Sequence, residues 1–116
     1  MTSLRLKDAP PTFGVFDQIE YDGRPAGETY EDHLRLMELA DRAGFYCNHV
    51  SEHHGTPLSL STSPSLLLAA ASQRTERIRL APLVYTLPYY NPYRLANEIC
   101  MLDQLSGGRF EFGVGR

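Results

Sequence analysis

The sequence has 116 residues and a formal net charge of -3 at pH 7. Its 42% hydrophobic and 22% charged residues are typical of a globular protein, and its basic residues are scattered, so we expect neither disorder nor nucleic-acid binding. No apolar run reaches the roughly 18 residues of a membrane span, and Met1–Pro11 lack a signal-peptide pattern, so we expect a cytoplasmic protein without membrane contact.

Four segments have the composition of β-strands. They recur at about 33 residues, which is the length of one strand-helix unit. The predicted strands are Phe13–Ile19, Phe45–Ser51, Ile78–Leu87 and Phe110–Val114.

The first predicted helix spans Thr29–Ala43. Thr29 followed by Asp32 indicates a capping box at its start, with Asp in place of the usual Glu. Tyr30, Leu34, Met37 and Ala40 share one face. Gly44 stands where a helix ends in the left-handed conformation.

Two further helices begin with a cap residue followed by proline. Ser63-Pro64 starts the second, which runs to Ser72 and is apolar nearly all round, so it must be covered on two sides. Asn91-Pro92 starts the third, which carries Leu95, Ile99 and Leu102 on one face and stops at Gly107-Gly108.

Alternation of strands and helices without hairpin turns predicts an α/β protein with a parallel sheet, either a doubly wound sheet or a barrel. In both folds, functional residues lie just after the carboxyl ends of the strands. These positions therefore hold the candidate site.

Ser51-Glu52-His53-His54, after the second strand, is the densest group of titratable residues. Adjacent side chains on extended backbone point to opposite faces, and the HExxH spacing is absent, so we predict no metal site here. A polar strand end remains an alternative for a lone histidine. The position of this group at a strand end and its density of titratable side chains favour a role in acid-base catalysis.

The other strand ends carry weaker signals. Tyr89 and Tyr90 either belong to the turn before the third helix or line a pocket for a ring-shaped ligand. Gly113-Val114-Gly115-Arg116 allows close approach of a ligand or of another backbone, and its guanidinium suits a phosphate. Cys47 and Cys100 have no redox or zinc spacing and are expected to be buried thiols.

Several motifs, taken together and in order, resemble the bacterial luciferase-like flavin monooxygenase family. They are Ser51-Glu52-His53-His54, Thr75-Glu76-Arg77-Ile78-Arg79-Leu80, Leu87-Pro88, Asn91-Pro92-Tyr93-Arg94, Leu102-Asp103-Gln104-Leu105-Ser106-Gly107-Gly108-Arg109-Phe110 and Gly113-Val114-Gly115-Arg116. The block that begins at Leu102 is the most specific of them.

This resemblance implies that residues 1–116 are one incomplete domain, the first four strand-helix units and N-terminal half of a TIM (β/α)8 barrel. It also implies reduced flavin mononucleotide (FMN) as cofactor, without a metal. By its position in the matching motif, His53 is implied to be the catalytic acid-base. The implied cofactor-binding residues are Glu52, His54, Leu83, Val84 and Arg116, with a cis peptide at Leu83-Val84 beneath the flavin ring and Arg116 at the flavin phosphate.

The implied partners are molecular oxygen, a small organic substrate, a flavin reductase and a second subunit bound through the second and third helices. We predict that glutamate at Leu67 or Leu68 weakens this homodimer and leaves each barrel folded. Gly115 and Asn91 stand where the luciferase α-chain has cysteine and histidine, so light emission is not supported. A deazaflavin-dependent oxidoreductase and a non-catalytic flavin-binding or dimerising fragment remain the alternatives.

Overall fold

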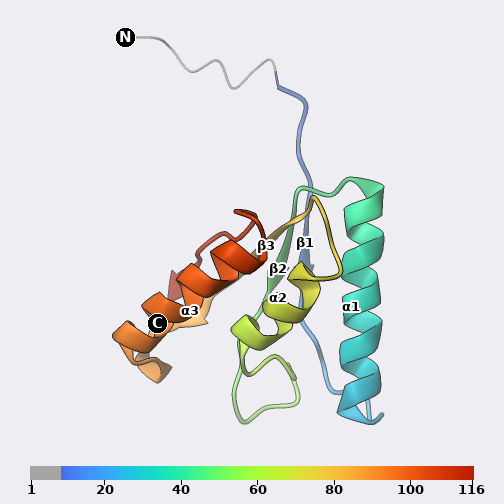
Figure 1. Ribbon diagram of the computed structural model, residues 1–116. Coiled ribbons are helices and arrows are strands. Elements are labelled where there is room, and N and C mark those ends of the chain that lie inside the picture. The colour runs from blue at the N-terminus through green and yellow to red at the C-terminus, as the bar shows by residue number, and fades with distance from the viewer. Residues whose placement is uncertain (1–8) are drawn as a thin grey trace.

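The computed structural model describes residues 9–116, so part of the N-terminal segment expected to lack a signal peptide lies outside the described residues. The elements follow one another as strand, helix, strand, helix (Figure 1). They are β1 (Gly14–Asp17), α1 (Ala26–Ala43), β2 (Cys47–Val50), α2 (Pro64–Ser72), β3 (Arg79–Pro82), β4 (Tyr85–Thr86), the 3-10 turn η1 (Leu87–Tyr89), α3 (Pro92–Leu105) and β5 (Val114–Gly115).

The strands are parallel, as the sequence predicts. β1, β2 and β3 form one sheet in that order, and β4 pairs with β5 in a second short ladder. A single parallel bridge between Leu80 and Phe110 links the two ladders. The described residues thus contain three strand-helix units followed by a fourth strand, and the fourth unit is represented by its strand alone.

The predicted third strand, Ile78–Leu87, is not continuous. It divides into β3 and β4 around a cis peptide bond between Leu83 and Val84, where the family resemblance implied one. The predicted fourth strand, Phe110–Val114, is also interrupted. Phe110 forms the isolated bridge with Leu80, and the ladder with β4 begins only at Val114 and extends to Gly115. A Cβ atom on Gly113 would lie 2.3 Å from the carbonyl oxygen of Pro82, so this glycine lets the two backbones approach.

The helices end where the sequence predicts, but only one of the predicted N-terminal caps forms its hydrogen bonds. Ser63 stands at the cap position of α2 without a side-chain cap bond. Asn91 caps α3 by accepting from the N–H groups of Tyr93 and Arg94 at 3.0 and 3.1 Å, and Gly44 ends α1 at a φ of 84°. The capping box is wrong, because α1 begins at Ala26 and Thr29 already lies inside it. Thr29 instead donates to Asp22, which precedes the helix.

Helix α2 lies between α1 and α3 and packs on β3, which provides the cover that its apolar sequence requires (Figure 1). Leu67 and Leu68 point into this core and are 9% and 0% exposed. The prediction that glutamate at either position leaves the fold intact is therefore wrong, because it would bury a charge among apolar side chains. The exposed leucine of α2 is Leu66, at 75%.

The two cysteines have different surroundings. Cys47 is buried, as predicted, but Cys100 on α3 is exposed, and both thiols are free. Within the described residues, no helix is long and apolar enough to cross a membrane.

A buried ion pair ties α1 to the carboxyl end of β1. His33 Nδ1 lies 2.7 Å from Oδ1 of Asp17, which is 4% exposed. This hydrogen bond with Asp17 raises the pKa of His33 above its ordinary value of 6.5, against the opposing effect of burial. The protonated imidazole is therefore the form that the fold stabilises.

We predict that His33→Gln destabilises the full-length protein more in mild acid than in alkali. Because the pKa is higher in the folded state, the stabilisation is complete below the unfolded value of about 6.5 and is lost as the pH rises through the folded value. Thermal unfolding of both proteins at about pH 6 and pH 9 measures this difference. An equal loss at the two pH values would contradict the prediction.

Candidate functional site

The side chain of Glu52 connects the carboxyl ends of β2 and β4. It is fully shielded from solvent, and its Oε1 lies 2.6 Å from Nε2 of His54. Oε2 accepts from the backbone N–H of Thr86 at 3.1 Å and from the hydroxyl of Tyr90 at 2.8 Å. We call Glu52, His54, Thr86 and Tyr90 the Glu52 cluster.

The two histidines beside Glu52 differ in their contacts. His54 packs against Tyr89, with ring centroids 4.5 Å apart, and its side chain is 34% exposed. His53 is half-buried, and among residues 9–116 its side chain has no hydrogen-bond partner. His53 is thus available to a bound molecule, whereas His54 is held by protein groups.

The environment of Tyr90 keeps its hydroxyl protonated. Burial raises the pKa of Tyr90 far above 10, and its hydrogen bond to Glu52 raises it further. Burial likewise raises the pKa of the neighbouring Tyr85 to about 12, and the Tyr85 hydroxyl lies 2.7 Å from that of Ser65. At neutral pH, Tyr90 therefore acts as a donor that fixes the position of Glu52.

Leu83 lies next to this cluster. Its N–H donates to the carbonyl oxygen of Val50 at 2.7 Å, immediately before Ser51, and its side chain is 47% exposed. A Cβ atom on Gly115 would meet the Val84 side chain at 2.6 Å, so glycine is needed for β5 to pair here. Leu83 therefore offers apolar surface beside the polar residues that follow β2.

Arg116 belongs to the same edge of the structure. It follows Gly115, which pairs with Thr86 in the parallel β4–β5 ladder, and it is exposed. The structure thus brings the predicted site residues after β2, β4 and β5 to one edge. The sequence did not predict Tyr90 and Thr86 as partners of Glu52. The pair of consecutive tyrosines after the third predicted strand was the one feature that pointed to the Tyr90 contact.

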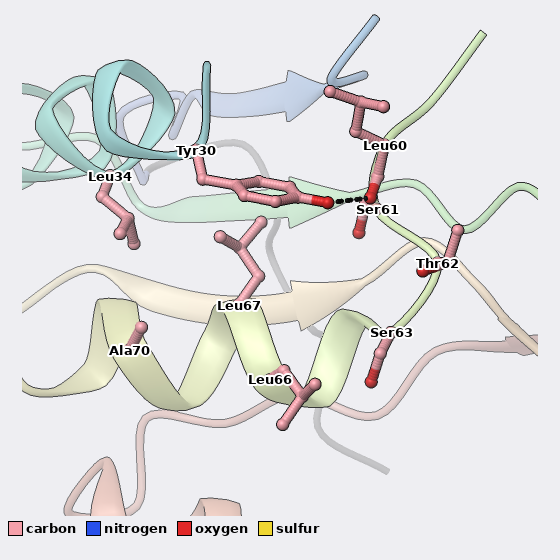
Figure 2. A pocket seen from close by; sticks show the side chains of 9 residues that line it. All are labelled: Tyr30, Leu34, Leu60, Ser61, Thr62, Ser63, Leu66, Leu67 and Ala70. Atoms are coloured by element: carbon pink, nitrogen blue, oxygen red, sulfur yellow. Dashed lines mark hydrogen bonds between the residues drawn. The ribbon is translucent and has the colours of Figure 1, made fainter. Parts of the chain in front are cut away.

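A separate apolar pocket of about 280 Å³ lies between α1 and α2 (Figure 2). Tyr30 and Leu34 form its α1 wall, and the hydroxyl of Tyr30 donates to the carbonyl oxygen of Leu60 at 2.7 Å. Leu66 contributes from α2. None of the Glu52 cluster lines this pocket, so it is distinct from the group of titratable residues.

Known proteins that resemble this chain include two that are named monooxygenases. Limonene 1,2-monooxygenase of Rhodococcus erythropolis is 44% identical over 82 residues, which cover 71% of this chain and 21% of that protein. The oxygenating constituent of 3,6-diketocamphane monooxygenase of Pseudomonas putida, a type II Baeyer-Villiger monooxygenase solved with FMN, superposes with a TM-score of 0.85 at 31% identity. That alignment covers 90% of this chain and 29% of the Pseudomonas chain.

A more distant structure is the coenzyme F420-dependent tetrahydromethanopterin reductase of Methanopyrus kandleri. It has a TM-score of 0.73 and 25% identity, over 92% of this chain and 27% of that chain. The chain thus spans less than a third of each of these three relatives. The luciferase-like monooxygenase family model matches residues 12–116, with the motifs, the parallel sheet and the superposition in agreement, and the chain therefore belongs to the luciferase-like monooxygenase family.

Proposed function

We propose that the protein containing this chain is a flavin-dependent monooxygenase that uses reduced FMN and oxygen to oxidise a small organic substrate. The observation that carries this proposal is the carboxyl edge of the sheet, where the buried Glu52 and the half-buried His53 follow β2 and the exposed Leu83 follows β3. Parallel sheets bind their ligands at this edge. When bound, the flavin supplies the oxygen chemistry, and the protein supplies binding, orientation and proton transfer.

The residues present fit such a cofactor. Leu83 and Val84 offer an apolar surface for a flat ring, His54 has a half-exposed ring held by Glu52, and Arg116 provides a charge for a phosphate at the same edge. In this arrangement Glu52 orients His54 and holds the turn that contains Tyr90. His53 is the acid-base that exchanges a proton with the substrate.

Residues 1–116 would form the N-terminal half of a TIM barrel, as one incomplete domain, with later strands supplying the substrate loops. A flavin reductase is the proposed partner that delivers reduced FMN, in keeping with the name "oxygenating constituent" of the Pseudomonas relative. We also propose a cytoplasmic location, because the exposed Cys100 thiol is free and reducing compartments preserve such thiols.

Oxygen consumption by the full-length protein with chemically reduced FMN tests this function. We expect faster oxygen uptake than with flavin alone once a suitable ketone or alkene substrate is added. Hydride transfer with a deazaflavin and no use of oxygen would overturn the proposal in favour of a reductase. Flavin binding without turnover of any substrate would identify a non-catalytic flavin binder.

The same full-length protein is proposed to form a homodimer through α2 and α3. Leu66 on α2 and Met101 on α3 are 75% and 64% exposed. Both line one apolar groove between the two helices, and Leu66 also lines the pocket beside α1. An apolar surface of this kind is typical of subunit interfaces.

We predict that Leu66→Glu shifts the full-length protein from dimer to monomer while leaving its thermal stability close to that of the parent. The exposed side chain contributes little to the core, but its charge cannot be buried at an interface without a partner. Sedimentation velocity at micromolar concentration measures the shift. Leu39→Glu, at an exposed leucine of α1 away from the groove between α2 and α3, is the matched control. A Leu66→Glu dimer of unchanged affinity would contradict the prediction.

A further inference from the structure

Three potential metal ligands meet at the amino-terminal end of the sheet, away from the Glu52 cluster. Cys47 is the first residue of β2, and His49 follows it on the same face at the two-residue spacing of a strand. Glu111 lies beside β3 because its N–H donates to the carbonyl oxygen of Leu80 at 2.9 Å. One ligand atom from each side chain lies within 4.8 Å of the other two.

The surroundings hold two of these side chains in place. His49 Nδ1 lies 3.3 Å from the carbonyl oxygen of Val15, and Glu111 Oε1 accepts from the hydroxyl of Tyr46 at 2.7 Å and from the guanidinium of Arg79. Hydrogen bonds of this kind orient ligands in metalloproteins. A carboxylate has further lone pairs, so these contacts leave Glu111 able to bind an ion.

Space for the imidazole depends on a glycine of the neighbouring strand. Gly14 pairs with Cys47 in the parallel register, and a Cβ atom at Gly14 would stand 3.2 Å from Cε1 of His49. The missing side chain thus gives the His49 ring its position next to Cys47. The three donors are partly or fully buried, with Cys47 at 0% exposure.

The chemistry of the three donors suits a cation. The hydroxyl of Tyr46 and the guanidinium of Arg79 both contact Oε1 of Glu111, so Oε2 is left for an ion. Zinc binds cysteine as the thiolate, so formation of the metal-sulfur bond releases the thiol proton of Cys47 to solvent.

We propose that Cys47, His49 and Glu111 form a binding site for Zn²⁺, with a water molecule as fourth ligand. Thiolate, imidazole and carboxylate are the donor set that zinc prefers, at about 2.0–2.3 Å. Such bonds place neighbouring donors about 3.5 Å apart, so side-chain shifts of about 1 Å close the site. This zinc ion would join β2 to the segment before β5, and the inference is independent of the proposed flavin chemistry.

The test uses the full-length protein, without a polyhistidine tag and freed of metal by a chelator that is then removed. Calorimetric titration with Zn²⁺ is expected to show one equivalent bound, and Co²⁺ is expected to give the near-ultraviolet thiolate-to-cobalt absorption band. Loss of groups that only orient ligands costs about 10–100-fold in affinity, so Cys47→Ser and His49→Gln are expected to lose at least about 100-fold.

Cys100→Ser is the matched control, because that thiol is exposed on α3, and it is expected to keep the cobalt band that Cys47→Ser loses. A parent protein without the band, or a Cys47→Ser variant with a band of equal strength, would overturn the proposal. If circular dichroism shows that Cys47→Ser is unfolded, the Glu111→Gln variant, on the segment before β5, is used to test the site. Unchanged zinc affinity in that variant would likewise overturn the site.

Discussion

Replacing His53 by alanine in the full-length protein is expected to lower turnover by about 10²–10⁴-fold, the usual effect of removing an acid-base group. The imidazole is half-buried at the carboxyl edge, and protein groups within the described residues do not occupy its nitrogens. Flavin affinity is expected to change little, because proton transfer requires a residue near the substrate and not a strong cofactor contact. Steady-state oxygen consumption and flavin titration measure the two quantities separately.

His54→Ala is the matched control for this change. His54 is bonded to Glu52 and packs on Tyr89, so its loss is expected to disturb the position of the ring and to cost less than the loss of His53. If His54→Ala proves the more damaging change, the assignment within the histidine pair is wrong. In that case the protein-bound histidine is the one that exchanges the proton.

The second large effect concerns residues 1–116 expressed alone, which are expected to bind FMN poorly and to show no turnover. Arg116 is the charge that this chain offers to the phosphate, and a partly solvated ion pair contributes about 1 kcal/mol. Micromolar binding requires about 8 kcal/mol. Leu83 adds apolar contact, but its exposed surface does not close this gap.

The isolated chain is also expected to self-associate. β1 lies at an edge of the three-stranded sheet. Phe16 in this strand and Phe13 just before it are 57% and 66% exposed. Unpaired N–H and C=O groups beside apolar side chains invite pairing with a second chain. Flavin fluorescence titration and light scattering at equal protein concentration test this. Stoichiometric low-micromolar binding by a monodisperse species would mean that these residues are a functional unit.

Much of the fold was predictable because it depends on local chemistry. The Asn91 cap, the left-handed Gly44 and the cover over the apolar α2 follow from hydrogen bonding and side-chain periodicity. The start of α1 did not follow, because Pro25 and Ala26 carry no capping side chain and Asp22 takes the Thr29 hydroxyl. The inward direction of Leu67 and Leu68 was equally hidden, since a helix apolar all round does not indicate which face is covered first.

The candidate site likewise combines features that the sequence predicts with contacts that only the folded structure creates. By itself, the sequence determined that Glu52, His53 and His54 follow a strand and that the chain has the motifs of its family, because motif order and strand-end position are properties of the chain. Only the tertiary structure decided that Glu52 bonds to Thr86 and Tyr90 across to β4, and that Glu111 meets Cys47 and His49. These contacts join residues far apart in sequence, and their partners are selected by the strand register and by the backbone approach that Gly14 and Gly113 permit.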